Sequence, residues 1–332
     1  MLRRLFPLAG LLLLTACDAG APVGHPDATV PTPTWAPPAS APPAGSISAV
    51  PSKPAGVALD AGGARLAVIS DKSALVLHEP ATGLAEIPAA EPPRGVVAVA
   101  GGGFRAVAGA AVLDLPPSAT APASWPLPAP GGAIAVPRAA DWTAVALPDR
   151  GDVIILSSAG TEIRTMHTGG RPSALAADDE RIAVLDAGQS SLTVYDAATG
   201  ARQEALRAGD GAVAVAAVGA PGGRSRFAVI DARDGELLVF DTGPLLLRQR
   251  YPVPGGAWAL AYDPGRRVLW VTATQRNEVV GFDLSGGTPR EVARHATVRL
   301  PVAVAVDPST GALAVGGSDA TGAEGLVQRI PA

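Results

Sequence analysis

The chain has few of the residues from which metal and redox sites are built. Its 332 residues include one cysteine, four histidines and one asparagine. A single cysteine excludes a disulfide framework, a multi-cysteine zinc site and a Cys-x-x-Cys-His haem attachment. The histidines, His25, His78, His167 and His295, do not include a pair with metal-ligand spacing. We therefore expect no bound metal and no other cofactor.

Lysine and long apolar runs are also scarce. Lys53 and Lys72 are the two lysines among 26 basic residues, and the formal net charge is −4 at pH 7. Nucleic-acid-binding domains carry a basic excess, so we expect no nucleic-acid partner. The longest apolar run, from Leu5 to Leu14, is about half the length of a membrane-spanning helix. A nucleophile elbow of the form Gly-x-Ser-x-Gly does not occur.

The N-terminus has the three-part layout of a secretory signal. Arg3 and Arg4 precede the apolar run, which ends in Leu14-Thr15-Ala16-Cys17. This phrase resembles the lipobox of bacterial lipoproteins, in which the cysteine receives a diacylglyceryl group. The resemblance implies a signal peptide over residues 1–16 and lipidation of Cys17. The chain would then be extracytoplasmic and anchored to the outer face of the bacterial cell membrane. The alternative is a trimmed signal peptide with an incidental cysteine.

Residues 17–45 are predicted to form a lipidated, proline-rich tether. Eight prolines lie between residues 18 and 45, where large apolar side chains are almost absent. Such a segment favours polyproline II and cannot bury enough surface to fold alone. Fully extended, it would reach roughly 80 Å. Trp35 and His25 are either docking points for a partner or incidental linker residues.

The remaining chain, residues 46–332, repeats one phrase at a period near 40 residues, which is typical of four-stranded propeller blades. An apolar strand containing alanine leads through a turn into a second apolar strand. The first strands end at residues 60, 100, 137, 178, 218, 263 and 307. Third strands such as 192–195 and 237–240 are followed by turns with Asp and Gly, residue types that favour tight turns. The pattern predicts an all-β, seven-bladed propeller.

The last repeat ends before its fourth strand. Residues 46–50, just ahead of the first repeat, resemble the fourth strands of other repeats. We predict that this N-terminal strand completes the last blade, which would close the ring and remove an exposed strand edge.

The repeats resemble the YVTN-type seven-bladed propellers, relatives of the WD-repeat and NHL folds. The closest phrases are Val306-Asp-Pro-Ser-Thr-Gly311 and Asn277-Glu-Val-Val-Gly-Phe-Asp283. More narrowly, Arg207-Ala-Gly-Asp-Gly211 and Pro244-Leu-Leu-Leu-Arg-Gln-Arg-Tyr-Pro252 are similar to an actinobacterial lipoprotein family typified by the mycobacterial protein LppL. That resemblance implies no particular activity.

Polar residues concentrate in the turns between second and third strands, which in a propeller lie at one mouth of the central channel. The candidate ligand-face residues are Asp71, Arg150, Asp152, Asp186, Gln189, Asp231, Arg233, Arg276, Asn277 and Asp319. The other interpretation is that these hairpin turns are polar because they are solvated. With no catalytic residues identified, we expect a monomeric, non-enzymatic binding or scaffold module for an envelope protein or small ligand. The alternative is a propeller enzyme of the lactonase or hydrolase type, with a site at the channel mouth.

Overall fold

A computed structural model describes residues 29–37, 41–63, 65–79, 83–117, 119, 121–219 and 225–332. The predicted signal peptide, Cys17 and the tether as far as residue 28 lie outside these described residues. All secondary-structure elements in the described part are strands. None of its segments is a helix long and apolar enough to cross a membrane.

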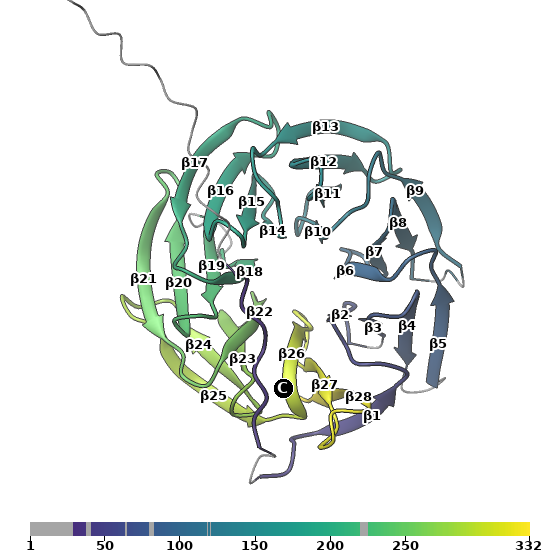
Figure 1. Ribbon diagram of the computed structural model, residues 1–332, viewed down its shortest axis with the longest axis vertical. Coiled ribbons are helices and arrows are strands. Elements are labelled where there is room, and N and C mark those ends of the chain that lie inside the picture. The colour runs from purple at the N-terminus through teal and green to yellow at the C-terminus, as the bar shows by residue number, and fades with distance from the viewer. Residues whose placement is uncertain are drawn as a thin grey trace, which may run out of the picture.

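The strands form seven four-stranded antiparallel sheets around a central axis (Figure 1), as the repeats predict. Blade 1 consists of β2 (Gly56–Leu59), β3 (Leu66–Ile69), β4 (Ala74–Glu79) and β5 (Gly83–Pro88). Blade 2 consists of β6 (Pro93–Ala98), β7 (Phe104–Ala108), β8 (Ala111–Leu115) and β9 (Ala123–Pro126). Blade 3 consists of β10 (Ala133–Ala135), β11 (Trp142–Leu147), β12 (Asp152–Ser157) and β13 (Glu162–His167). Blades 4 and 5 are β14 (Ala174–Ala177), β15 (Arg181–Asp186), β16 (Ser191–Asp196), β17 (Arg202–Arg207); and β18 (Ala212–Ala217), β19 (Arg226–Asp231), β20 (Glu236–Asp241), β21 (Leu246–Pro252). Blades 6 and 7 are β22 (Ala257–Asp263), β23 (Val268–Ala273), β24 (Glu278–Asp283), β25 (Arg290–Ala296); and β26 (Arg299–Val306), β27 (Leu313–Ser318), β28 (Gly325–Ile330), with β1 (Ser46–Val50).

The N-terminal strand closes the ring, which confirms that prediction. β1 is the outer strand of blade 7 and pairs antiparallel with β28, from Ser46 opposite Arg329 to Val50 opposite Gly325. The fully buried Gln328 reinforces this junction, because its amide nitrogen donates to the carbonyls of Ala44 and Ala296 at 2.6 and 3.0 Å. Closure therefore joins the two ends of the propeller and covers the edge of β28 that would otherwise be exposed.

The hydrophobic core is divided into seven clusters, and each lies between two adjacent blades. Because a middle strand packs against neighbours on both faces, its residues are buried without alternation. Leu66–Ile69 and Arg226–Asp231 show this pattern. The outer strand Arg202–Arg207 is largely exposed. Apolar burial between blades is the main favourable term in such a fold.

Arginines also join the blades, on the face that carries the turns between first and second strands. The guanidinium of Arg105 (blade 2) donates to the Thr143 hydroxyl (blade 3) at 2.7 Å. Corresponding contacts run from Arg65 to the Phe104 ring, Arg181 to Ser225, Arg226 to the Leu284 carbonyl, Arg266 to the Thr310 carbonyl and Arg329 to the Gly63 carbonyl. At the junction of blades 3 and 4, Asp179 instead accepts from the backbone of Ala139 and Ala140. The sequence repeats did not predict these links.

The aspartates that end the first strands cap the following turns. The buried Asp307 accepts hydrogen bonds from the Ser309 backbone at 2.9 Å, from the hydroxyls of Ser309 and Thr310, and from Gly62 of the next blade at 3.3 Å. Burial by itself would raise the pKa of the Asp307 carboxyl, but these hydrogen bonds hold the pKa below its ordinary value. The repeated aspartate is therefore structural at this position.

Candidate functional site

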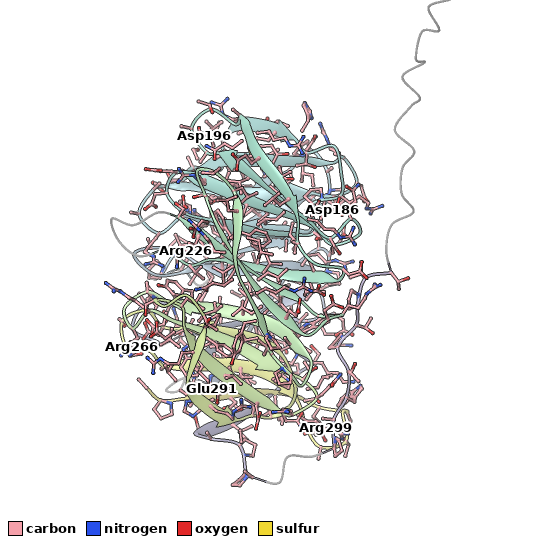
Figure 2. All side chains as sticks on the ribbon, turned by 90° about the vertical axis from the view of Figure 1, so that its left-hand side faces the viewer. Asp186, Asp196, Arg226, Arg266, Glu291 and Arg299 are labelled. Carbon is pink, nitrogen blue, oxygen red and sulfur yellow. The ribbon has the colours of Figure 1, made fainter. Side chains whose placement is uncertain are left out.

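The candidate residues lie on one face of the propeller, which we call the loop face. It comprises the turns between second and third strands: residues 70–73, 109–110, 148–151, 187–190, 232–235, 274–277 and 319–324. Figure 2 shows Asp186 on this side of the disc together with Arg299 of β26, whereas Arg226 and Arg266 lie on the opposite side.

Two of the predicted ligand-face acids hold the backbone of their own blade. Asp186 accepts from the amides of Arg171 at 2.8 Å and Gln189 at 3.0 Å. Asp231, fully buried, accepts from Asp210 at 2.8 Å and Arg233 at 3.1 Å. In blades 4 and 5, these contacts connect the segment that enters the blade to the turn between the second and third strands of that blade. We assign both acids a structural role.

Glycines make room for these two carboxylates. A Cβ on Gly170 would lie 2.4 Å from Asp186 Oδ2, and one on Gly209 would lie 1.9 Å from Asp231 Oδ2. The Gly-Asp phrase at residues 209 and 210, noticed in the sequence as a family likeness, is thus explained by packing against Asp231.

Arg150 and Asp152 meet at the start of β12. Asp152 is buried, and its two oxygens contact Arg150 Nε at 3.0 Å and His167 Nδ1 at 2.6 Å. Both partners are substantially exposed. The trio is a hydrogen-bonded network at the rim of the loop face, and together with Asp149 and Arg171 it lines an open pocket.

Blade 5 brings three acids together on the loop-face side. Asp231, Asp234 and Glu236 have carboxylate oxygens within 4.8 Å of one another. Arg250 bridges two of them, with distances of 3.6 Å to Asp234 and 2.6 Å to Glu236. Because Asp231 is also engaged by backbone amides, existing contacts account for the group.

The remaining acidic candidates differ in their surroundings. Asp71 is exposed in the turn after β3. Asp319 accepts from the Thr321 hydroxyl at 2.5 Å and from the amides of Ala323 at 2.8 Å and Glu324 at 3.1 Å. The hydroxyl bond, followed by those from the backbone, lowers the pKa of Asp319 to about 2. Its carboxylate organises the longest turn of the loop face.

Residues 29–37 of the predicted tether lie across the loop face. Residues 29–37, which we call the strap, pass over blades 5, 6 and 7 (Figure 1). The sequence led us to expect a stalk that holds the propeller away from its anchor. Here the strap is extended, without pairing in a sheet, and Ala36 within it is buried to 4% exposure.

Three propeller side chains bind carbonyls of the strap. Asn277 Nδ2 donates to the Pro37 carbonyl at 2.7 Å, and Arg299 Nε donates to the Ala36 carbonyl at 2.8 Å. The Arg233 guanidinium donates to the Thr29 carbonyl. Two of these three residues, Arg233 and Asn277, are among the predicted ligand-face residues.

Trp35 packs against blade 7. Its ring centroid lies 4.9 Å from the Arg299 guanidinium carbon and 5.7 Å from Lys53 Nζ, distances suited to cation–π contact. A Cβ on Gly322 would come within 2.5 Å of the ring. The ring remains 43% exposed, so it is held at an open edge of the face.

Asn277 is shaped for its place in the turn. It has a φ of 54°, a left-handed conformation that asparagine adopts more readily than most residues. Its Oδ1 accepts from the Leu300 amide at 3.0 Å while its Nδ2 binds the strap. Arg276 beside it is exposed, with its side chain against Gly255.

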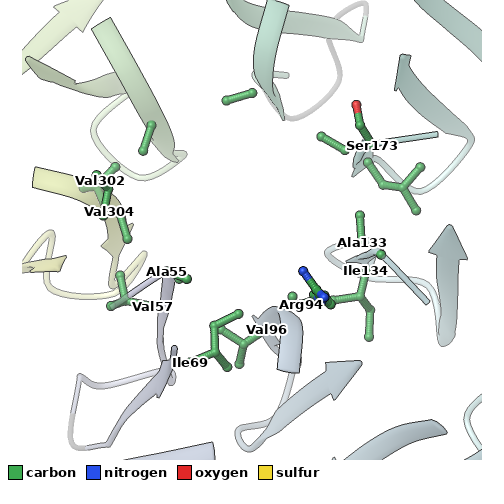
Figure 3. A pocket seen from close by; sticks show the side chains of 18 residues that line it. Ala55, Val57, Ile69, Arg94, Val96, Ala133, Ile134, Ser173, Val302 and Val304 are labelled. Carbon is green, nitrogen blue, oxygen red and sulfur yellow. The ribbon is translucent and has the colours of Figure 1, made fainter. Parts of the chain in front are cut away.

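On the loop-face side, the central channel opens into a cavity of about 310 Å³ (Figure 3). Small aliphatic side chains such as Val57, Val96 and Val302 line it, with Arg94 and Ser173 as its two polar side chains. Ser173 is engaged by the Leu185 carbonyl and the Ala187 amide. Among the described lining residues, no acid stands beside Arg94 to make an acid–base pair.

Sequence reasoning missed Arg299 and Lys53 and left Trp35 undecided. The backbone that brings Trp35 to Arg299 belongs to segments far apart in the chain, and no short motif marks the contact. The scarcity of lysine was the one available signal, since it makes Lys53 conspicuous just after the closing strand.

Comparison with known proteins shows the fold alone. No protein-family profile and no curated protein matches the chain. Among solved structures, hydrazine synthase of Kuenenia stuttgartiensis is similar with a TM-score of 0.67 and 14% identity, covering 84% of this chain and 96% of that one. U3-55K is similar with a TM-score of 0.71 and 8% identity, covering 86% and 100%. At these identities no activity is transferable.

Proposed function

We propose that this chain is an extracytoplasmic lipoprotein, related to the LppL-type family and anchored through lipidated Cys17 to the outer face of the bacterial cell membrane. Its propeller serves as a non-enzymatic binding or scaffold module for an envelope protein or small ligand. The lipobox-like phrase ending in Cys17 supports the anchor, and the seven-bladed fold suits a binding module.

The observation that carries the binding role is the strap on the loop face. Side chains from three blades, Arg233, Asn277 and Arg299, converge on one extended peptide. The same face therefore supplies hydrogen-bond donors where a ligand would lie. The aliphatic cavity at the channel mouth has Arg94 as its one charged lining residue, so the part of the loop face that holds the strap is the better site.

Crosslinking in intact cells tests this function. Cells carrying the wild-type chain, the Cys17→Ala variant or an unrelated lipoprotein are treated with a mild crosslinker, and captured proteins are identified. We expect a specific envelope protein with the wild type, and its loss with Cys17→Ala because the anchor sets the location. The adaptor role is wrong if wild type captures nothing beyond the unrelated lipoprotein while Cys17→Ala leaves cell behaviour unchanged. Stoichiometric divalent metal in the purified protein would instead favour the enzyme alternative.

A further inference from the structure

The strap differs chemically from the strands it crosses. Pro31, Pro33 and Pro37 have no backbone N–H, so the strap cannot supply a regular strand edge. The three hydrogen bonds described above between the strap and the propeller all use strap carbonyls as acceptors. The donors are two guanidiniums and one amide NH₂ group, and guanidinium is a donor without acceptor capacity. The face is therefore matched to a chain that offers carbonyls but few N–H groups.

The shape of the loop face follows the same segment. A Cβ on Gly211 would lie 2.8 Å from Pro31 Cγ, and one on Gly322 would lie 2.5 Å from the Trp35 ring. These two glycines, in blades 5 and 7, leave space for a proline ring and an indole at opposite ends of the strap. Ala36, whose carbonyl binds Arg299, is buried. Backbone acceptors, a proline and an aromatic ring are thus recognised at separate points.

We propose that the loop face between Arg233 and Arg299 is a binding site for extended, proline-rich polypeptide, and that the strap is its intramolecular occupant. This inference rests on the proposed function and specifies its partner: a segment of another envelope protein with prolines and an aromatic residue spaced as Pro31 and Trp35 are. Such a partner displaces the strap, because both use the donors of Arg233, Asn277 and Arg299.

The strap competes with any added peptide for the loop face, and this competition determines how tightly the peptide is expected to bind. The strap is joined to β1 by only a short segment, and short tethers give effective concentrations on the order of millimolar. A peptide added in solution must therefore compete with the strap at that effective concentration. Weakening the strap should therefore strengthen binding of the same peptide from solution, while weakening the face should abolish it.

The test uses a fluorescent peptide with the sequence of residues 29–37 and full-length protein carrying Cys17→Ser. Anisotropy is measured with the otherwise unaltered chain, with a chain whose residues 29–37 are replaced by glycine and serine, and with Trp35→Ala, which keeps the strap length. We expect the last two to bind the peptide at least 10-fold more tightly than the unaltered chain. Adding Arg299→Ala to either should remove that binding, whereas adding Arg290→Ala, a matched arginine on β25, should not.

Two outcomes overturn the inference. One is that both strap variants bind the peptide no more tightly than they bind a control peptide in which the tryptophan is replaced by alanine. The other is that Arg299→Ala leaves binding intact. Failure of the proposed function is separate: an envelope partner captured in cells regardless of Arg299→Ala would preserve the adaptor role and refute the proline-rich site. Peptide binding without any captured envelope protein would do the reverse.

Discussion

Arg299 holds Trp35 and the following residue of the strap at once. Its guanidinium carbon lies 4.9 Å from the indole centroid, and its Nε donates to the Ala36 carbonyl at 2.8 Å. The planar guanidinium suits this combination because it stacks through its face and donates through its edge. An ammonium group has the charge without that geometry.

Arg299→Lys should therefore release Trp35 despite conserving charge. In protein labelled with 5-fluorotryptophan, we expect the Trp35 fluorine resonance to sharpen and move toward the position of free tryptophan. Trp35→Phe identifies that resonance, and Lys72→Ala, at an exposed lysine in the turn after β3, serves as the control. An unchanged Trp35 resonance in Arg299→Lys would show that the guanidinium geometry is unimportant.

Two substitutions of Asn277 distinguish the contribution of its side-chain hydrogen bonds from that of its left-handed backbone conformation. Asn277→Ala removes both side-chain hydrogen bonds and leaves at φ 54° a residue that adopts the left-handed conformation less readily than asparagine does. Asn277→Gly removes the same bonds but tolerates the left-handed backbone. We expect a loss of about 1–3 kcal/mol for the alanine variant, with glycine less destabilised by about 1 kcal/mol. Urea unfolding measures both, and equal losses would argue against backbone strain as a contributor.

Ring closure should be sensitive to a single methyl group at Gly325. A Cβ there would lie 2.0 Å from the Ser52 carbonyl oxygen, so alanine must push β28 away from the end of β1. Overpacking of this kind costs about 1–3 kcal/mol. Gly219→Ala is the control, because its Cβ meets nothing within 4 Å. If thermal unfolding shows the two variants to be equally stable, the junction is looser than described.

Deletion of residues 46–52, which removes β1 altogether, should cost most of the stability of the propeller.

The ion pair of Arg105 and Asp114 lies within blade 2, with Arg105 buried and Asp114 partly buried. The pair distance is 2.8 Å, and Arg105 also lies 4.7 Å from the Trp125 ring. Asp114→Ala leaves a buried guanidinium without its counterion and should cost about 3–5 kcal/mol. The double variant Arg105→Met with Asp114→Leu should recover most of that loss. Arg290→Ala, which breaks an exposed pair, should cost less than about 1 kcal/mol in the same denaturant series.

Asp307 makes part of the stability dependent on pH. Its folded pKa lies below the ordinary value because of its hydrogen bonds. The contribution is therefore complete above the unfolded pKa of about 3.9 and is lost as pH falls through the lower, folded pKa. Asp307→Asn should be less stable than wild type at pH 7 by about 1–3 kcal/mol, and the gap should narrow below about pH 4. A gap that stays constant from pH 7 to pH 3 would contradict this assignment.

The ring was predictable because its signals are local and repeated. Strand patterns recur with Asp and Gly turns, and the incomplete last repeat makes residues 46–50 the natural partner of β28. The roles of Asp186 and Asp231 were not predictable, since a polar turn residue looks the same whether it faces a ligand or caps the backbone. Docking of the strap was missed for a related reason. Proline-rich composition indicates an extended chain but does not say whether that chain is free or bound.

Because the strap and β1 belong to one N-terminal segment, the propeller has a defined order of response to mechanical load. Tension applied ahead of Thr29 reaches the carbonyl contacts of Arg233, Asn277 and Arg299 before it reaches the five residue pairs of β1 and β28. The three strap contacts break one at a time, and the extended chain lengthens as each one breaks. Only then is the closing strand strained. We therefore expect a pulling force applied ahead of Thr29 to detach the strap before it opens the ring.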